Sequence, residues 1–593
     1  MPPVSRRHFL IALGASTPAL RLWAQEGNDD VVLRAMRDEL ERSRQLRVVG
    51  GSGDEIPYFI SYVLSDTDSF SVSASFGAVN SATRTRYRFP VIEVRVGGYD
   101  FDNTGHIFSG LYTGSRYDVE ALPLDDNYLS LREGFWLGTD HAYKAAVESI
   151  ARKRAALNSA TVSTDKLPDF SKADPVTSLG KIGAPKIEEA GWTARVAKLS
   201  GIFSAYPEVL ASGVELHLNQ GPTYLVNSEG TALRYPDDVM WCYAKAEGQA
   251  DDGMVIREGI SVQTLEAAQF PPEAELQKAI TAMGEHVKAL SHASAAEAMF
   301  SGPVLFEPQA AAQLLAQLLG DNLRLPRKPV AEPGRNVNFF PSEFEGRIGG
   351  RVLPDWMDVI DDPTQTAWQG KPLIGSYLFD FDGVKPSPVS LIEKGVLRRY
   401  LTTRQPMKNS PRSNGHARLP GPYGTKTAAI GNLFVKAGQT TPLADLKTRL
   451  IQLCKDRDKP YGMLVRKLDF PFSADNSEVQ ALSAASMQSG GSARPVSPPV
   501  LIYRVYPDGR EELVRGLRFR GVSSRSLRDI LAASTETTLF DYVNNGAPLA
   551  RLGAGGFLAP AAVIAPGLLF EEMELERAQD QLQKPAIVPP PST

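Results

Sequence analysis

The chain has 593 residues, of which 42% are hydrophobic and 22% are charged, and its net charge is −4 because 64 Lys and Arg stand against 68 Asp and Glu. A chain of this length exceeds what one hydrophobic core usually supports, so we expect two or more domains. Phosphate contacts need clustered Lys and Arg, and no long basic run is present. The composition therefore argues against generic nucleic-acid binding.

The N-terminus has the features of an export signal. Residues 5–10 (Ser-Arg-Arg-His-Phe-Leu) match a twin-arginine pattern, and an apolar stretch of small residues follows over 9–20. That stretch is too short to cross a bilayer, which takes about 20 residues. We predict a signal peptide over residues 1–24 with cleavage near Ala24, and a periplasmic or secreted mature protein that is not held in a membrane.

The chain has two cysteines, Cys242 and Cys454, and no C-x-x-C pair, which excludes a zinc ribbon. Two readings remain open for this pair. They are either two buried free thiols or one long-range disulfide in an oxidising compartment.

The first half of the mature chain mixes helices with antiparallel strands. Periodicity of 3.6 residues predicts helices, and alternation of apolar and polar residues predicts strands. Residues 70–76 show this alternation clearly. The expected elements are a helix over 29–44, strands over 58–64, 70–76 and 87–96, helices over 141–157 and 188–199, strands over 214–218 and 223–231, and a helix over 271–290. We treat 27–298 as one mixed α+β region.

The second half, 301–577, is predicted to be a β-rich domain that begins after a boundary near 291–302. A strand over 304–306 leads into a helix over 308–319, and hairpins follow. The hairpin over 389–397 turns at Lys394-Gly395, as expected for a tight turn with glycine. We predict a Ser-, Gly- and Pro-rich loop over 487–499 and a disordered Pro-rich tail over 578–593. The predicted fold class is α+β.

Several short motifs in the second half carry a family resemblance through their order and spacing. They are L-L-A-Q-L-L-G-D over 314–321, D-D-P-T over 361–364, G-S-Y over 375–377, N-G-H-A-R over 414–418 and N-L-F-V over 432–435. Together they resemble the TldD/PmbA family of modulator-of-gyrase proteases. The resemblance implies a mixed N-terminal domain, a β-rich C-terminal domain, and paired subunits around a cavity that admits extended or unfolded peptide.

The chain departs from the zinc motif of the metal-binding branch, L-L-H-E-x-x-x-H. Ala316 and Asp321 stand where that motif has histidines, and Gln317 stands where it has the glutamate. Zinc needs lone pairs from His, Cys or carboxylate, and hydrolysis needs a base for the bound water. The resemblance places a third ligand, a cysteine, within 541–546, where Asn544 or a neighbour stands instead. We therefore predict no catalytic residue and no bound zinc.

The loop that contains Asn414, His416 and Arg418 is the candidate substrate-binding segment. The resemblance places this loop along the cleft, and its side chains can bind peptide carbonyls or a carboxylate. The alternative is that Asn414-Gly415 makes a tight turn that the neighbouring residues support.

Two functional hypotheses follow. The first is an exported, non-catalytic protein that binds peptide or completes an assembly, either as a homodimer or as a heterodimer with a metal-bearing paralogue. The second is a metallopeptidase with a non-standard metal site built from Asp321 and His416.

Overall fold

The computed structural model describes residues 30–47, 55–107, 115–116, 122–159, 167–325, 327–331, 341–420, 424–472, 496–544, 559–578 and 582. The predicted signal peptide, almost all of the predicted tail and most of the predicted 487–499 loop lie outside these residues. Within them, no helix combines the length and the apolar composition that crossing a membrane requires.

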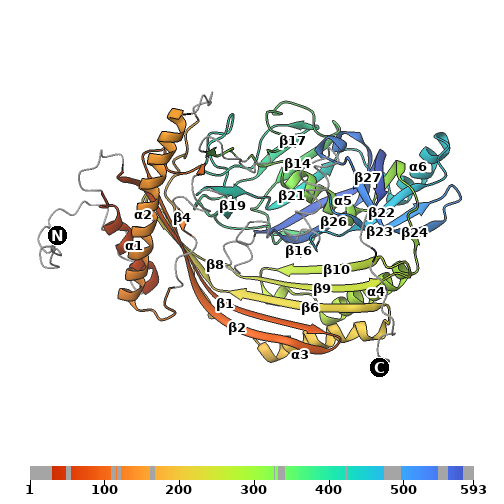
Figure 1. Ribbon diagram of the computed structural model, residues 1–593, viewed down its shortest axis with the longest axis horizontal. Helices are drawn as coiled ribbons and strands as arrows, with labels where there is room; N and C mark the ends of the chain where they lie inside the picture. Colours follow the sequence, from red (N-terminus) through yellow and green to blue (C-terminus); the bar gives the residue numbers. More distant parts are fainter. Residues whose placement is uncertain are drawn as a thin grey trace, which may run out of the picture.

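A nine-stranded sheet dominates the first half (Figure 1). Its central path runs in the order β10-β9-β6-β1-β7-β8-β5; off this path, β2 pairs with β1, and β4 pairs with β2. The strands are β1 (Pro57–Ser75), β2 (Ala78–Val96), β4 (Ser115–Arg116), β5 (Thr177–Leu179), β6 (Val209–Gln220), β7 (Pro222–Asn227), β8 (Ala232–Pro236), β9 (Val239–Gln249) and β10 (Val255–Thr264).

The sequence predicted separate strands over 58–64 and 70–76, but β1 runs through both without a break. The polar residues between them are accommodated by ion pairs to β2. The carboxylate of Asp66 accepts hydrogen bonds from Arg86 and Arg88, and that of Asp68 accepts from Arg84. Pairing offsets the cost of burying a charge, so a polar interruption in the sequence does not end the strand.

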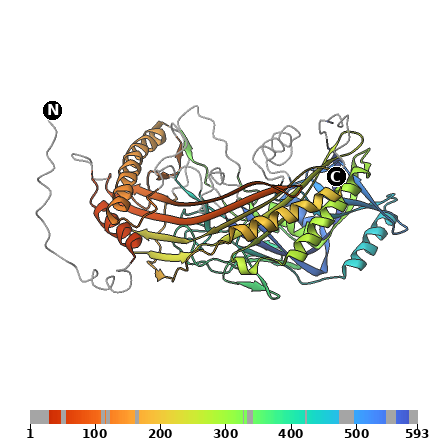
Figure 2. The same cartoon turned by 90° about the horizontal axis from the view of Figure 1, so that it is seen from below.

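Four helices pack on this sheet: α1 (Val31–Ser43), α2 (Tyr128–Ser159), α3 (Glu189–Gly201) and α4 (Glu273–Ser291). Helices α3 and α4 cover one face, as the view from below shows (Figure 2). Helix α2 begins earlier than the predicted 141, because Leu131 and Phe135 are buried in the core that it shares with α1 and β1. Two short 3₁₀ turns, η2 (Ile202–Ala205) and η3 (Ala267–Gln269), precede α4.

The second half forms a twelve-stranded sheet around α5 (Pro308–Gly320) and α6 (Leu443–Asp456). Its core path is β11-β24-β23-β22-β12-β27-β21-β14-β17-β18, with β25 and β26 paired to β27. The strands are β11 (Ser294–Ala295), β12 (Phe300–Phe306), β14 (Met357–Asp361), β17 (Val389–Glu393), β18 (Val396–Leu397), β21 (Asn432–Ala437), β22 (Gly462–Leu468), β23 (Pro499–Val505), β24 (Glu511–Arg515), β25 (Leu517–Arg520), β26 (Ile530–Asn544) and β27 (Ala559–Arg577).

The smaller paired elements are β3 (His106–Ile107) with β13 (Val330–Ala331), β15 (Ala367–Trp368) with β16 (Lys371–Pro372), and β19 (Ala417–Pro420) with β20 (Lys426–Ala428); η5 (Ser524–Asp529) is a 3₁₀ turn before β26. The predicted turn at Lys394-Gly395 is present, and both residues have positive φ, 48° and 72°. The α+β class predicted from the sequence is confirmed. The predicted domain limits, 27–298 and 301–577, remain predictions.

Both cysteines are buried free thiols. Cys242 lies in the core between the first sheet and α3 and α4, whereas Cys454 lies in α6. Burial raises the pKa of the Cys242 thiol to about 12, so it is an unreactive core residue.

Buried ion pairs join the two halves. Lys426 of β20 donates to Glu93 of β2 at 2.7 Å and to Asp382 at 2.8 Å. Farther along, Lys467 of β22 pairs with Glu258 of β10. Burial acts to raise the pKa of Glu93, but attraction to Lys426 and Arg95 outweighs it and holds that pKa at about 2. The position of the first sheet against the second half therefore depends on satisfied buried charges.

We predict that Lys426→Met lowers the free energy of unfolding at pH 7 by about 3–5 kcal/mol, because it leaves two buried carboxylates without their shared cation. The folded pKa of Glu93 lies below its unfolded value of about 4.3, so its stabilising contribution is present above that value and is lost as the pH falls toward 2. The loss of stability between pH 5 and pH 2 should thus be shallower in the variant. Urea unfolding measures both effects, and Lys144→Met, at an exposed pair, is the control. Equal effects of the two substitutions would contradict the prediction.

Candidate functional site

The altered zinc motif lies on the last turns of α5, a helix buried between β22, β26 and β27. Pro308 occupies the first turn, where its missing N–H costs nothing, and the helix ends at Gly320. The Ala316 side chain is 4% exposed and lies in the main core of the second half. It fills a packing position and offers no electron pair to a metal.

The other two motif positions are held by protein hydrogen bonds. The Gln317 amide Nε2 donates to the Gln313 carbonyl at 3.0 Å, and its Oε1 accepts from the backbone N and the Oγ of Ser497 at 2.8 and 2.9 Å. Asp321 pairs with Arg324. A carboxylamide with both ends engaged cannot act as a general base, and a carboxylate neutralised by arginine is a weak metal ligand.

Tyr542 of β26 lies beside the end of this helix, where the third ligand was expected. Its ring is buried and packs against Phe470 and Phe540 at centroid distances of 5.1 and 5.7 Å. Its hydroxyl lies 3.8 Å from the position that a Cβ on Gly320 would take. Asn544 ends β26, and its side chain is outside the described residues. The aromatic ring thus packs where a zinc site of the expected type would need ligands.

The chemistry of these residues does not fit zinc. Within the ranges that the structure describes, no three His, Cys, Asp or Glu side chains gather in a way that could hold a metal ion. The alternative pair, Asp321 and His416, is engaged elsewhere, because His416 Nε2 lies 3.2 Å from Asp361 Oδ1.

The predicted substrate-binding loop is a buried polar network in this conformation. His416 is fully buried, and its Nδ1 lies 3.0 Å from the Asn414 carbonyl and 2.9 Å from the Asn414 Oδ1. Asn414 also donates to the Tyr400 carbonyl and accepts from Thr402 N. Sequence reasoning missed Asp361, whose carboxylate accepts from Gly431 N and contacts His416. Peptide contact by Asn414 and His416 stays a prediction.

Arg418 follows this network and packs behind a residue that lines an open cavity. Its guanidinium donates to the Ile430 and Pro560 carbonyls at 3.1 and 2.6 Å and lies 4.3 Å from the ring centroid of Tyr377. Tyr377 lines the cavity, and its hydroxyl donates to the Gly415 carbonyl at 2.7 Å. The predicted loop therefore supports one wall of the cavity from behind.

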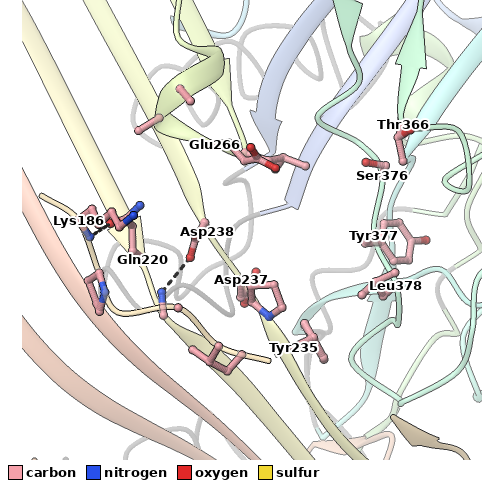
Figure 3. Close-up of a pocket in the computed structure, with 18 of the residues that line it drawn as sticks. Lys186, Gln220, Tyr235, Asp237, Asp238, Glu266, Thr366, Ser376, Tyr377 and Leu378 are labelled. Atoms are coloured by element: carbon pink, nitrogen blue, oxygen red, sulfur yellow. Dashed lines mark hydrogen bonds between the residues drawn. The ribbon is translucent and has the colours of Figure 1, made fainter. Parts of the chain in front are cut away.

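The cavity has a volume of about 910 Å³ and lies between the first sheet and the second half (Figure 3). One wall carries acidic side chains at the ends of β8, β9 and β10, and the other carries hydroxyl groups after β14 and β16. The acidic residues are Asp237, Asp238 and Glu266, and the hydroxyl-bearing residues are Thr364, Thr366, Ser376 and Tyr377. Figure 3 shows Asp237, Asp238 and Glu266 across the open space from Thr366, Ser376 and Tyr377.

Hydrogen bonds fix the acidic wall. Asp238 Oδ1 accepts from Gly221 N at 3.0 Å, and Asp237 Oδ2 accepts from the Thr223 hydroxyl at 2.7 Å. Burial raises the pKa of Asp238, the Gly221 N–H lowers it, and the neighbouring Asp237 raises it again. This cavity could not be predicted from sequence patterns, because its walls come from segments that are far apart in the chain.

Comparison with known proteins identifies the architecture. Residues 301–457 match the family model described as the PmbA/TldA metallopeptidase C-terminal domain. Residues 301–457 are thus a C-terminal domain of the TldD/PmbA type. The matched residues include the altered α5 motif and the loop with His416, so the family resemblance deduced from the motifs is confirmed.

The curated relatives match short stretches of this chain. The chain is 31% identical over 98 residues to a metalloprotease from Methanocaldococcus jannaschii and 34% identical over 64 residues to one from Methanothermobacter thermautotrophicus. These matches cover 16% and 11% of this chain and 20% and 13% of the relatives, so each relative is matched over a small part of its length.

Solved structures show that the likeness in fold extends over nearly the whole chain. TldE from Thermococcus kodakarensis has a TM-score of 0.53 at 12% identity, covering 91% of this chain and 100% of that one. A putative modulator of a DNA gyrase from Thermotoga maritima has a TM-score of 0.51 at 13% identity, covering 87% and 95%. The fold of the TldD/PmbA family is therefore present in both halves.

We predict that His416 resists modification by diethylpyrocarbonate, whereas His292, with a side chain 65% exposed, reacts readily. The His416 reaction should be slower by on the order of tenfold or more, because it requires local opening of the loop. Mass spectrometry of tryptic peptides measures both rates in the same sample. Similar rates would mean that the loop opens in solution and that His416 is available to a ligand.

Proposed function

We propose that this chain is an exported, non-catalytic member of the TldD/PmbA family that binds extended polypeptide. It acts as a homodimer or beside a metal-bearing paralogue, and residues 1–24 direct it to the periplasm or the exterior. The observation that carries the proposal is the state of the motif on α5. Ala316 is a packing residue, Gln317 is bonded to Ser497, and Asp321 is paired with Arg324.

The cavity supports the binding part of the proposal. A volume of about 910 Å³ lies within the range of ligand-binding pockets, roughly 300–1,000 Å³. Its hydroxyl groups can donate to and accept from peptide groups. Its carboxylates Asp237, Asp238 and Glu266 can bind basic side chains or a free amino group, and Lys186 and Lys385 of the same lining can bind carboxylates. A peptide with charged groups of both signs is the ligand that this lining fits.

A peptidase that uses Asp321 and His416 is not favoured by any contact described above. His416 is fully buried against Asp361, and Asp321 is paired with Arg324. Both side chains would have to leave their partners before they could hold a metal together.

We predict that the mature protein, purified without a metal-affinity tag, carries far less than one zinc ion per chain, and that EDTA changes neither its thermal unfolding nor its peptide binding. The reason is that the motif on α5 supplies neither histidine nor a free carboxylate. Elemental mass spectrometry and a thermal melt measure these quantities. Roughly one zinc per chain, with a melting temperature that falls in EDTA, would refute the non-catalytic proposal.

We predict that filling the cavity blocks peptide binding. Ala268 is an exposed residue of η3 that lines the cavity, so Ala268→Trp should occupy space without disturbing a core. Affinity for fluorescein-labelled tryptic peptides of β-casein, measured by fluorescence anisotropy, should fall by about tenfold or more. Ala151→Trp, on an exposed face of α2, is the matched control and should bind as the unaltered protein does. Equal binding by both variants would place the peptide elsewhere.

A further inference from the structure

The face of the first sheet that is turned away from α3 and α4 carries a cross-strand row of four polar or aromatic residues. Ser71 pairs with His217, His217 with Trp241, and Trp241 with Gln263, on β1, β6, β9 and β10 in turn. Directly paired residues project from the same face of a sheet. The row is therefore continuous across four strands.

The neighbouring row establishes which face this is. Val72, Leu216 and Cys242 are paired in the same way and belong to the core beneath α3 and α4. Because side chains alternate along a strand, the row that ends at Gln263 points to the opposite side, on which Tyr243 of β9 packs against Phe472 of the second half. The imidazole of His217 and the indole of Trp241 stack there, with centroids 4.9 Å apart and planes 16° apart.

Gln263 is the anomaly in this row. Its side chain is 7% exposed, and neither its Nε2 nor its Oε1 has a hydrogen-bond partner among the described residues. Buried amides are nearly always bonded, because leaving donor and acceptor unpaired costs stability. By contrast, the buried amide of Gln313 donates to the Leu468 and Phe470 carbonyls and accepts from Leu468 N.

The row runs alongside the cavity. Gln220 at the end of β6, Asp238 before β9 and Leu265 after β10 line the cavity, and His217, Trp241 and Gln263 lie two or three residues away along the same strands. A chain that enters the cavity can therefore continue onto this face without leaving the sheet.

The geometry points to Gln263 as a binding site for one peptide group of an extended polypeptide. A side-chain amide offers one acceptor and a donor beside it, which is the complement of the C=O and N–H of a peptide unit. The His217–Trp241 stack provides a flat surface for the adjacent ligand side chain. Because both amide atoms of Gln263 are buried, a neighbouring side chain rotates to admit the peptide. This inference rests on the proposed peptide-binding function. It identifies the Gln263 amide as the group that forms hydrogen bonds with the ligand backbone.

The test separates a ligand-binding amide from a structural one. Gln263→Leu and Gln263→Met remove an unpartnered amide, so both variants should unfold at the same temperature as the unaltered protein or higher. Their affinity for fluorescein-labelled tryptic peptides of β-casein should nevertheless fall by about tenfold or more, which is about 1.4 kcal/mol. Gln313→Leu is the matched control, and it should unfold at a lower temperature because its amide is fully bonded.

The outcomes are distinct. If the full-length protein binds the peptides and Ala268→Trp blocks binding, but both Gln263 variants bind normally, this inference is overturned and the proposed function stands. Destabilisation by Gln263→Leu like that of Gln313→Leu, with affinity unchanged, also overturns it by assigning Gln263 a structural role. Absence of peptide binding by the unaltered protein overturns the inference and the proposed function together.

Discussion

The arrangement of the molecule depends on charges that are buried between its two halves and satisfied there. Lys426 holds Glu93 and Asp382, and Lys467 holds Glu258, so each lysine of the second half fixes a strand of the first sheet. A buried charge without a partner is far more costly than a surface one, which makes these contacts specific in position. The cavity exists because the sheet is held at this separation from the second half and does not collapse onto it.

The replaced motif on α5 is a coherent local structure and not a site with one missing part. The Gln317 Nε2 donates to the Gln313 carbonyl while its Oε1 accepts two bonds from Ser497. A glutamate at this position would turn a carboxylate oxygen toward that carbonyl, and two acceptors repel each other. Gln317 therefore matches the hydrogen-bonding groups around it, and the Tyr542 hydroxyl lies near the end of the same helix.

Much of the fold could be read from the sequence because its signals are local. The periodicity of α4, the proline at the start of α5 and the glycine turn at Lys394-Gly395 each follow from residues within one element. That Ala316 and Gln317 cannot replace a zinc ligand and a catalytic base could be predicted equally well, because this follows from the residue types and does not depend on the fold. The long β1 was missed because Asp66 and Asp68 are compensated by arginines about twenty residues away, and the cavity was missed because its walls join segments from both halves. The burial of His416 could not be predicted from the sequence either, because it depends on a contact with Asp361, which is remote in the chain.

The ion pairs between β1 and β2 also determine the charge of the sheet face that borders the cavity. Asp66 and Asp68 alternate along β1 as Arg84, Arg86 and Arg88 do along β2, and all of them project on the side of α3. A slip of one residue between the strands would turn every arginine to the opposite side. The hydroxyl-bearing surface formed by Ser69, Ser71, Thr83 and Thr85 would then become strongly cationic. These ion pairs therefore fix the register of the two strands. By doing so they keep charged side chains away from the inner surface of the sheet.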